Sequence, residues 1–128
     1  MSIDFEMPIL VVDDYKTMVR IIGNLLKQLG FYNIDEATDG NTALLKLQKK
    51  KYDLVISDWN MQPVSGLDLL RNMRETDSLK KTPFIMVTAE SKTENVVTAK
   101  EAGVDNYIVK PFTASTLKSK MSSIFGNF

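Results

Sequence analysis

Polar side chains that could do chemistry follow four of the apolar runs in the sequence, at the point where each run ends. Asp13 and Asp14 follow the first run, and Asp58 follows another near the middle of the chain. Thr88 and Lys110 follow two later runs in the same way. Taken singly, each has an ordinary structural explanation, because aspartate and threonine cap helices or start turns and a lysine is usually solvated. Together they would form a site if the fold brought the four run ends to one edge.

Three carboxylates at one edge would need a cation. Two unit charges about 4 Å apart repel by about 4 kcal/mol at an effective dielectric of about 20, so Asp13, Asp14 and Asp58 would destabilise one another. The chain contains no histidine and no cysteine, which removes the usual ligands of zinc, haem and copper. Because oxygen-only ligands select hard ions, we expect Mg²⁺ or a similar ion there.

A magnesium site of this kind favours phosphoryl chemistry, because Mg²⁺ keeps positions open for phosphate oxygens. With histidine and cysteine absent, the expected nucleophile is a carboxylate, whose attack on phosphorus gives an aspartyl phosphate. The transition state spreads negative charge over the phosphoryl oxygens, which a metal, an ammonium and a hydroxyl can each bind. Lys110 and Thr88 are therefore predicted to be the electrophilic partners.

The apolar runs predict a parallel sheet. They are continuous rather than alternating, which is typical of strands buried on both faces, and a helical pattern separates each from the next. The predicted strands are residues 9–12, 33–37, 54–56, 84–87 and 107–109. A repeated strand–helix order predicts an α/β fold, a doubly wound (βα)5 three-layer sandwich with its site beyond the carboxyl ends of the strands.

The helices that must cover this sheet are marked by caps and apolar stripes. The first ends where Gly30 can take a left-handed conformation, and Asp39, Ser65 and Thr113 are predicted to cap the second, third and fifth. The fourth, at residues 93–102, has few apolar side chains, so we expect it to pack loosely and be partly exposed. The basic run at residues 49–51 is interpreted as a solvated helix end.

Length and charge exclude several classes of protein. A chain of 128 residues predicts one domain, residues 1–128, and its 16 basic and 16 acidic residues give a formal net charge of zero. The field that attracts nucleic acid or an anionic membrane is therefore missing. No apolar run reaches the roughly 18 residues that span a bilayer. The acidic start and the lack of cysteine favour a cytoplasmic protein.

Four short motifs resemble a known family. The sequence has Val-Val-Asp-Asp at residues 11–14, Ser-Asp-Trp-Asn-Met at 57–61, Thr-Ala-Glu at 88–90 and Lys-Pro-Phe at 110–112. Together they resemble the receiver domain of two-component response regulators over nearly the whole chain, most of all the stand-alone receivers of chemotaxis. The resemblance implies the strand order 2-1-3-4-5 and a signalling switch rather than an enzyme.

The resemblance also implies a role for each residue of the site. Asp58 would be the phosphoacceptor, and Thr88 and Lys110 would bind the phosphoryl oxygens. Mg²⁺ would be held by Asp13, Asp14, Asp58 and the main-chain carbonyl of Asn60.

Other positions match the family's variable and switching residues. Asn60 and Glu90 match positions that modulate dephosphorylation, and the phosphoryl group is expected to be short-lived. Tyr107 matches the switch aromatic, whose rotation would alter a partner-binding face that includes Lys92 and Lys120.

The loop after the phosphoacceptor departs from the family pattern. Its usual Met-Pro is replaced by Met61 followed by Gln62, and the proline has moved to Pro63, whereas Gly66 keeps the family's place. Because proline restricts its own φ and the residue before it, we expect a different loop path beside the metal.

By resemblance, the chain is a monomer that takes phosphate from a histidine kinase and binds a flagellar motor switch protein, and a phosphatase is a further candidate partner. The alternative within the family is a phosphorelay carrier that passes phosphate to another protein's histidine. Two other classes fit less well. A hydrolase with an aspartate nucleophile would want a second acid two residues after Asp58, and a flavin carrier would want a phosphate-binding loop where Asp13 and Asp14 stand.

Overall fold

The computed structural model describes residues 3–89 and 93–128, in which five strands and five helices alternate along the chain. The strands are β1 (Ile9–Val12), β2 (Ile34–Ala37), β3 (Leu54–Asp58), β4 (Phe84–Thr88) and β5 (Asn106–Val109). All neighbouring strands are parallel, and their order is β2-β1-β3-β4-β5. The predicted fold class and strand order are confirmed.

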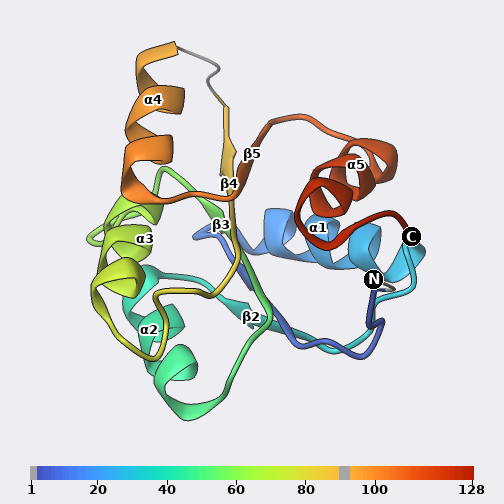
Figure 1. Ribbon diagram of the computed structural model, residues 1–128, viewed down its shortest axis with the longest axis horizontal. Coiled ribbons are helices and arrows are strands. Elements are labelled where there is room, and N and C mark those ends of the chain that lie inside the picture. Colours follow the sequence, from blue (N-terminus) through green and yellow to red (C-terminus); the bar gives the residue numbers. More distant parts are fainter. Residues whose placement is uncertain (1–2, 90–92) are drawn as a thin grey trace.

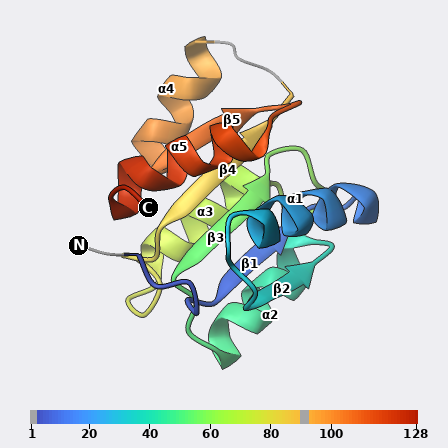
Figure 2. The same ribbon diagram turned by 90° about the vertical axis from the view of Figure 1, so that its right-hand side faces the viewer.

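Helices cover both faces of this sheet. They are α1 (Lys16–Gln28), α2 (Gly40–Lys49), α3 (Gly66–Glu75), α4 (Thr93–Ala102) and α5 (Ala114–Phe125). Figure 1 shows α1 and α5 on one side of the sheet and α2, α3 and α4 on the other, and Figure 2 shows α1 and α5 lying in front of the strands. The result is the expected three-layer sandwich.

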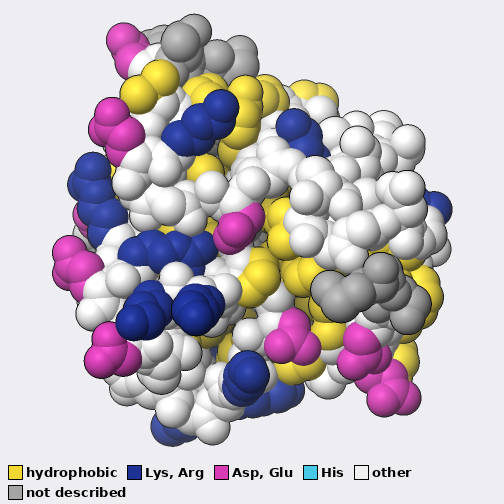
Figure 3. All heavy atoms as spheres, in the orientation of Figure 1, with side chains coloured by type: hydrophobic (Ala, Val, Ile, Leu, Met, Phe, Trp, Pro, Cys, Tyr) yellow, Lys and Arg dark blue, Asp and Glu magenta, His cyan; other side chains and the backbone are white. Residues whose placement is uncertain are grey.

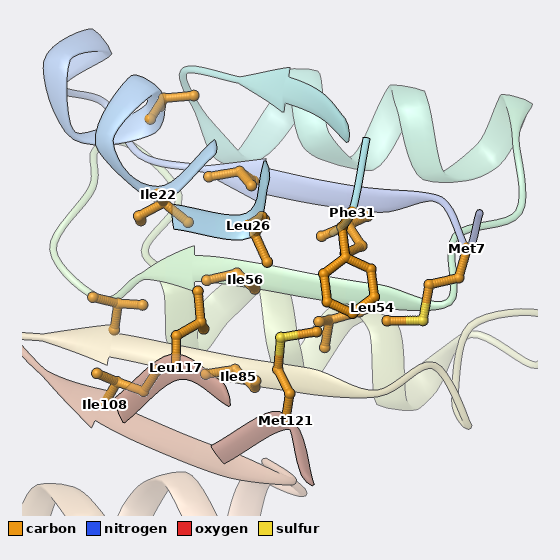
Figure 4. Close-up of a cluster of buried hydrophobic side chains, with 14 residues drawn as sticks. Met7, Ile22, Leu26, Phe31, Leu54, Ile56, Ile85, Ile108, Leu117 and Met121 are labelled. Atoms are coloured by element: carbon orange, nitrogen blue, oxygen red, sulfur yellow. The ribbon is translucent and has the colours of Figure 1, made fainter. Parts of the chain in front are cut away.

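Each strand contributes to two separate hydrophobic cores, which explains why the apolar runs are continuous. In β1, Ile9 and Val11 belong to the core under α1 and α5, whereas Leu10 and Val12 belong to the core on the opposite face. Successive strand side chains point to opposite faces, so both kinds of position must be apolar when both faces are covered. Figure 4 shows the first core, in which side chains from α1, β3, β4, β5 and α5 meet.

Local capping interactions fix three helix starts where the sequence predicts them. The side chain of Asp39 accepts a hydrogen bond from the Thr42 amide at 2.7 Å, and that of Thr113 accepts one from the Thr116 amide. Ser65 forms a capping box with Asp68. Helix α1 is different, because Tyr15 stands at its N-cap position without a side-chain cap. Gly30 has φ +108°, as its predicted role requires.

Helix α4 is the least buried part of this framework. Ala99 is buried, but Val97 is 47% exposed, which confirms that the helix is partly exposed. No described helix is long and apolar enough to cross a membrane.

Two strands run further than their apolar residues. β3 continues through Asp58 and β4 through Thr88, so the polar residues are the last members of the strands rather than loop residues. Backbone bonds from Trp59 to Val87 and from Lys110 to Thr88 extend the pairing beyond the apolar runs. The rigid sheet therefore positions both side chains.

Candidate functional site

Three carboxylates meet beyond the carboxyl ends of β1 and β3. These strands are neighbours, with Val12 paired to Ser57, so Asp13 and Asp58 follow directly beside each other. One carboxylate oxygen from each of Asp13, Asp14 and Asp58 lies within 4.8 Å of the others. Asp13 is 1% and Asp58 5% exposed, whereas Asp14 is exposed. The sheet thus forms the predicted acidic cluster.

Lys110 follows the edge strand β5 and also reaches this cluster. Its Nζ lies 3.0 Å from Asp58 Oδ1 and 3.3 Å from Asp13 Oδ2. The main-chain bond from Lys110 to the Thr88 carbonyl, 2.8 Å long, fixes where the lysine leaves β5. One ammonium therefore links two carboxylates that arise from different strands.

The site keeps an excess of negative charge even with this lysine. Burial raises the pKa of Asp58, the hydrogen bond from Lys110 lowers it, and the charges of Asp13 and Asp14 raise it, so the net shift is upward. Burial alone would lower the pKa of Lys110, but its hydrogen bond to Asp58 and the charge of Asp13 raise it overall. Lys110 therefore stays cationic and balances only one of the three carboxylates.

The donor set fits a divalent cation. Three carboxylate oxygens converge, and no histidine or cysteine is present in the sequence to compete with them. Hard oxygen donors of this kind bind ions such as Mg²⁺ or Ca²⁺. The geometry therefore supports a divalent metal site at this acidic cluster.

Gly66, the first residue of α3, lies very close to the main chain of Asp58. The Gly66 amide donates to the Trp59 carbonyl at 2.9 Å, which brings the start of α3 back against the end of β3. A Cβ added at Gly66 would lie 2.1 Å from the Asp58 carbonyl oxygen and 2.9 Å from Met86 Sδ. Only glycine fits this close approach, a contact that sequence reasoning did not assign.

The loop between Asp58 and α3 contains the displaced proline. Met61 is buried in the core, whereas Asn60, two residues after Asp58, is exposed. The Gln62–Pro63 peptide bond is cis, and so is Lys110–Pro111 on the other side of the site.

A small cavity lies between the end of β4, helix α4 and strand β5. Its volume is about 10 Å³, and Trp59, Thr88, Asn95, Ala99 and Tyr107 are among its lining residues. Thr88 is 5% exposed, and Tyr107 is half-buried, with Lys120 Nζ 5.2 Å from the centre of its ring. The structure thus places Thr88 and Tyr107 on one cavity, and Tyr107 beside Lys120. Two predicted residues, Glu90 and Lys92, lie outside the described residues.

Comparison with known proteins identifies the family. Residues 9–122 match the response regulator receiver domain, so the chain belongs to this family. It is 55% identical over 120 residues to the chemotaxis protein CheY-3 of Vibrio cholerae, covering 94% of this chain and 92% of that protein. It is also 52% identical to the chemotaxis protein CheY of Pseudomonas aeruginosa, covering 93% and 96% of the two chains. It is thus a CheY-type chemotaxis response regulator, a signalling switch rather than a conventional enzyme.

Solved structures agree with this assignment. CheY4 of Vibrio cholerae superposes with a TM-score of 0.85 at 32% identity, covering 91% of this chain and 97% of that one. The receiver domain of a sensor histidine kinase from Pseudomonas aeruginosa, solved with magnesium in its active-site cleft, shares the fold with a TM-score of 0.84, 24% identity, and coverage of 95% and 99%.

Proposed function

We propose that this chain is a stand-alone receiver, residues 1–128, in which Asp58 accepts a phosphoryl group from the phosphohistidine of a histidine kinase in a Mg²⁺-dependent reaction. The observation that carries the proposal is the bridge of Lys110 between Asp58 and Asp13 inside a cluster of three carboxylates. An ordinary ion pair would need one carboxylate, whereas phosphoryl transfer uses the excess negative charge to hold a cation.

The roles follow from what each side chain can reach. Asp13, Asp14, Asp58 and the Asn60 carbonyl are the proposed holders of Mg²⁺, which would neutralise charge on the transferred group. A carboxylate oxygen of Asp58 attacks phosphorus, a new O–P bond forms, and the N–P bond to the donor histidine breaks with its electron pair returning to the imidazole. The Lys110 ammonium moves from carboxylate to phosphoryl oxygen.

Thr88 links this reaction to the surface. Its hydroxyl is the proposed donor to another phosphoryl oxygen, and it lines the same small cavity as Tyr107. A shift of Thr88 towards the phosphoryl group would give the Tyr107 ring room to turn inward. Phosphorylation would then favour one arrangement of the face that carries Tyr107 and Lys120, because the two arrangements differ in affinity for phosphate.

The proposed reader of this face is a flagellar motor switch protein, a role supported by the likeness to chemotaxis proteins. Asn60 and Glu90 are proposed to allow water to reach the phosphoryl group and limit its lifetime, with a phosphatase as a further partner. The protein would act as a cytoplasmic monomer. If phosphate passed from Asp58 to a histidine of another protein instead, the chain would be a phosphorelay carrier.

Phosphorylation by a small phosphodonor with Mg²⁺ tests the proposal. Intact-mass spectrometry should show one added phosphoryl group, and Asp58→Asn should abolish it. Asp77→Asn is the matched control, because the side chain of Asp77 is fully exposed and far from the cluster along the chain. Label remaining on Asp58→Asn, or lost from Asp77→Asn, would contradict the assignment of Asp58.

A further inference from the structure

A groove rich in lysine lies at the edge of the sheet opposite the acidic cluster. Two hollows of about 470 and 280 Å³ adjoin there and share Lys51, Tyr52, Ser78 and Thr82 in their linings. Their lysines come from two separate segments, 49–51 before β3 and 80–81 before β4. We call these two hollows, with Lys49, Lys50, Lys51, Lys80 and Lys81, the lysine groove.

Most of this positive charge is not neutralised inside the protein. Lys50 pairs with Asp35 at 3.1 Å, and Lys80 approaches the fully exposed Asp77 at 3.7 Å. Within residues 3–89 and 93–128, no ion pair is present for the remaining three lysines of the groove, which are exposed. Figure 3 shows Lys and Arg side chains gathered at the lower left, over the loops that lead into β3 and β4.

Helix-end solvation accounts for only part of this pattern. Lysines 49 and 50 stand at the end of α2, where the macrodipole favours a cation. Lys80 and Lys81 belong to the segment between α3 and β4 and line the larger hollow with Lys51, whereas Lys49 and Lys50 line the adjoining smaller one. A concave surface lined by like charges from two segments is a feature that an anionic partner would stabilise.

The groove is separate from the phosphoacceptor and from the Tyr107 face. It is lined by residues that precede β3 and β4, whereas Asp58 and Thr88 end these strands. A five-residue strand spans about 13 Å, so both sites can be occupied together. A ligand in the groove would therefore hold the receiver near a partner without blocking phosphoryl transfer.

The chemistry of the lining selects the occupant. All cations among the lining residues are lysines, whereas recognition of phosphate groups by a planar bidentate fork uses arginine. Asp53 and Asp77 interrupt the positive surface, so an unbroken row of phosphates would meet their charges, whereas a peptide can place uncharged residues beside them. A flat membrane would not follow two adjoining hollows. An extended peptide can place its carboxylates on the lysines and its polar groups on the Ser78 and Thr82 hydroxyls.

We propose that the lysine groove is a docking surface for an acidic peptide segment of a partner protein. Docking of this kind raises the effective concentration of the receiver at its partner without requiring phosphorylation. The proposal does not depend on the assigned phosphoacceptor.

Fluorescence anisotropy with a short fluorescein-labelled peptide of alternating glutamate and serine tests this proposal. The wild-type chain should bind it saturably, more weakly at higher salt, and should not bind the same peptide with glutamine in place of glutamate. Amide shifts in NMR spectra should concentrate at residues 49–53 and 77–83. No saturable binding, or shifts confined to other surfaces, would overturn the proposal.

Paired variants separate the groove from a general charge effect. Lys51→Ser/Lys81→Ser should weaken binding by roughly 2- to 30-fold, the range expected for two exposed ion pairs. Arg20→Ser/Lys27→Ser removes the same charge from exposed positions of α1 and should leave affinity unchanged. Equal weakening by both variants would refute the groove. Tighter binding of wild type to phosphatidylserine vesicles or a DNA oligonucleotide than to the peptide would refute the peptide as occupant. A circular dichroism spectrum and a urea midpoint equal to those of the wild type verify the fold of each variant.

Discussion

Lys110 and Arg74 are cations of similar low exposure at opposite ends of the strands, but their surroundings differ. Lys110 is 21% exposed and contacts the carboxylates of Asp13 and Asp58. Arg74, on α3, is 18% exposed, and its guanidinium donates to the carbonyls of Gly103, Leu79 and Thr82 as well as to the Asp105 carboxylate. Lys110 thus lies among carboxylates whose negative charge it only partly neutralises, whereas Arg74 donates hydrogen bonds to the acceptors around it.

The difference separates the proposed phosphorylation site from a structural one. Asp105 Oδ2 accepts from Arg74 at 3.1 Å and from the Phe84 amide at 2.8 Å, so the carboxylate joins the starts of β4 and β5. Planar guanidinium groups suit such fixed, multiple acceptors. Lys110 is a compact charge on a flexible stem, which can transfer from a carboxylate to a phosphoryl oxygen. We therefore expect the loss of a carboxylate from the acidic cluster and the loss of the Arg74 guanidinium to change stability in opposite ways.

The largest expected effect is steric and lies at the carboxyl edge. Gly66→Ala should lower the free energy of unfolding by about 3 kcal/mol, because its Cβ would meet the Asp58 carbonyl oxygen. Urea denaturation measures the change. Gly23→Ala is the matched control: its added Cβ would meet only Glu36 Oε2 at 4.0 Å, so α1 should be stabilised slightly. Equal stabilities of the two variants would contradict the close approach at Gly66.

Arg74→Met tests the hydrogen bonds that Arg74 donates near the starts of β4 and β5. It keeps an apolar stem but removes the hydrogen bonds that Arg74 donates to Asp105 and three carbonyls, so the free energy of unfolding should fall by about 2 kcal/mol. Arg74→Lys should recover part of this loss, because it restores the charge but not the fork. Urea denaturation of both variants provides the measurement. Full recovery by lysine would show that charge alone matters.

Asp14→Asn should act in the opposite direction. Without Mg²⁺ it should raise the free energy of unfolding by up to about 1 kcal/mol, because it removes a like charge that exposure partly screens. The stabilisation by added Mg²⁺ should become smaller than in the wild type. Thermal melts with and without Mg²⁺ report both effects. Loss of stability in the absence of metal would contradict an excess of negative charge.

The smallest expected effect concerns the hydrogen bond between Tyr52 and Asp35. Tyr52 donates to Asp35 Oδ2 at 2.6 Å, and this bond lowers the pKa of Asp35, partial burial opposes the shift, and Lys50 lowers it further. A lowered folded-state pKa stabilises the protein above the unfolded value of about 3.9 and ceases to do so as the pH falls through the folded value. Tyr52→Phe should therefore cost about 0.5 kcal/mol at neutral pH.

That difference should shrink below about pH 4, as Asp35 becomes protonated. Urea denaturation of the wild type and Tyr52→Phe at several pH values provides the measurement. A difference that stayed constant down to the acid range would assign the effect to packing of the ring rather than to the carboxylate.

Local patterns in the sequence were enough to predict most of the fold and the members of the acidic cluster. The apolar runs marked the strands, and Asp39, Ser65 and Thr113 cap their helices as expected. These signals are readable because strand burial and helix capping depend on neighbours a few residues apart. Asp13, Asp14 and Asp58 were predicted to meet because the carboxyl ends of parallel strands share one edge.

Contacts between distant segments were decided only by the tertiary structure. Lys110 and Asp13 are 97 positions apart, and their 3.3 Å contact depends on the order and twist of the strands between them. The acceptors of Arg74 are mainly carbonyl groups, which every residue has, so no sequence pattern marks them. The need for glycine at Gly66 likewise arises from the returning backbone of Asp58. Residue type limits what a side chain can do, but packing of the chain determines which groups it meets.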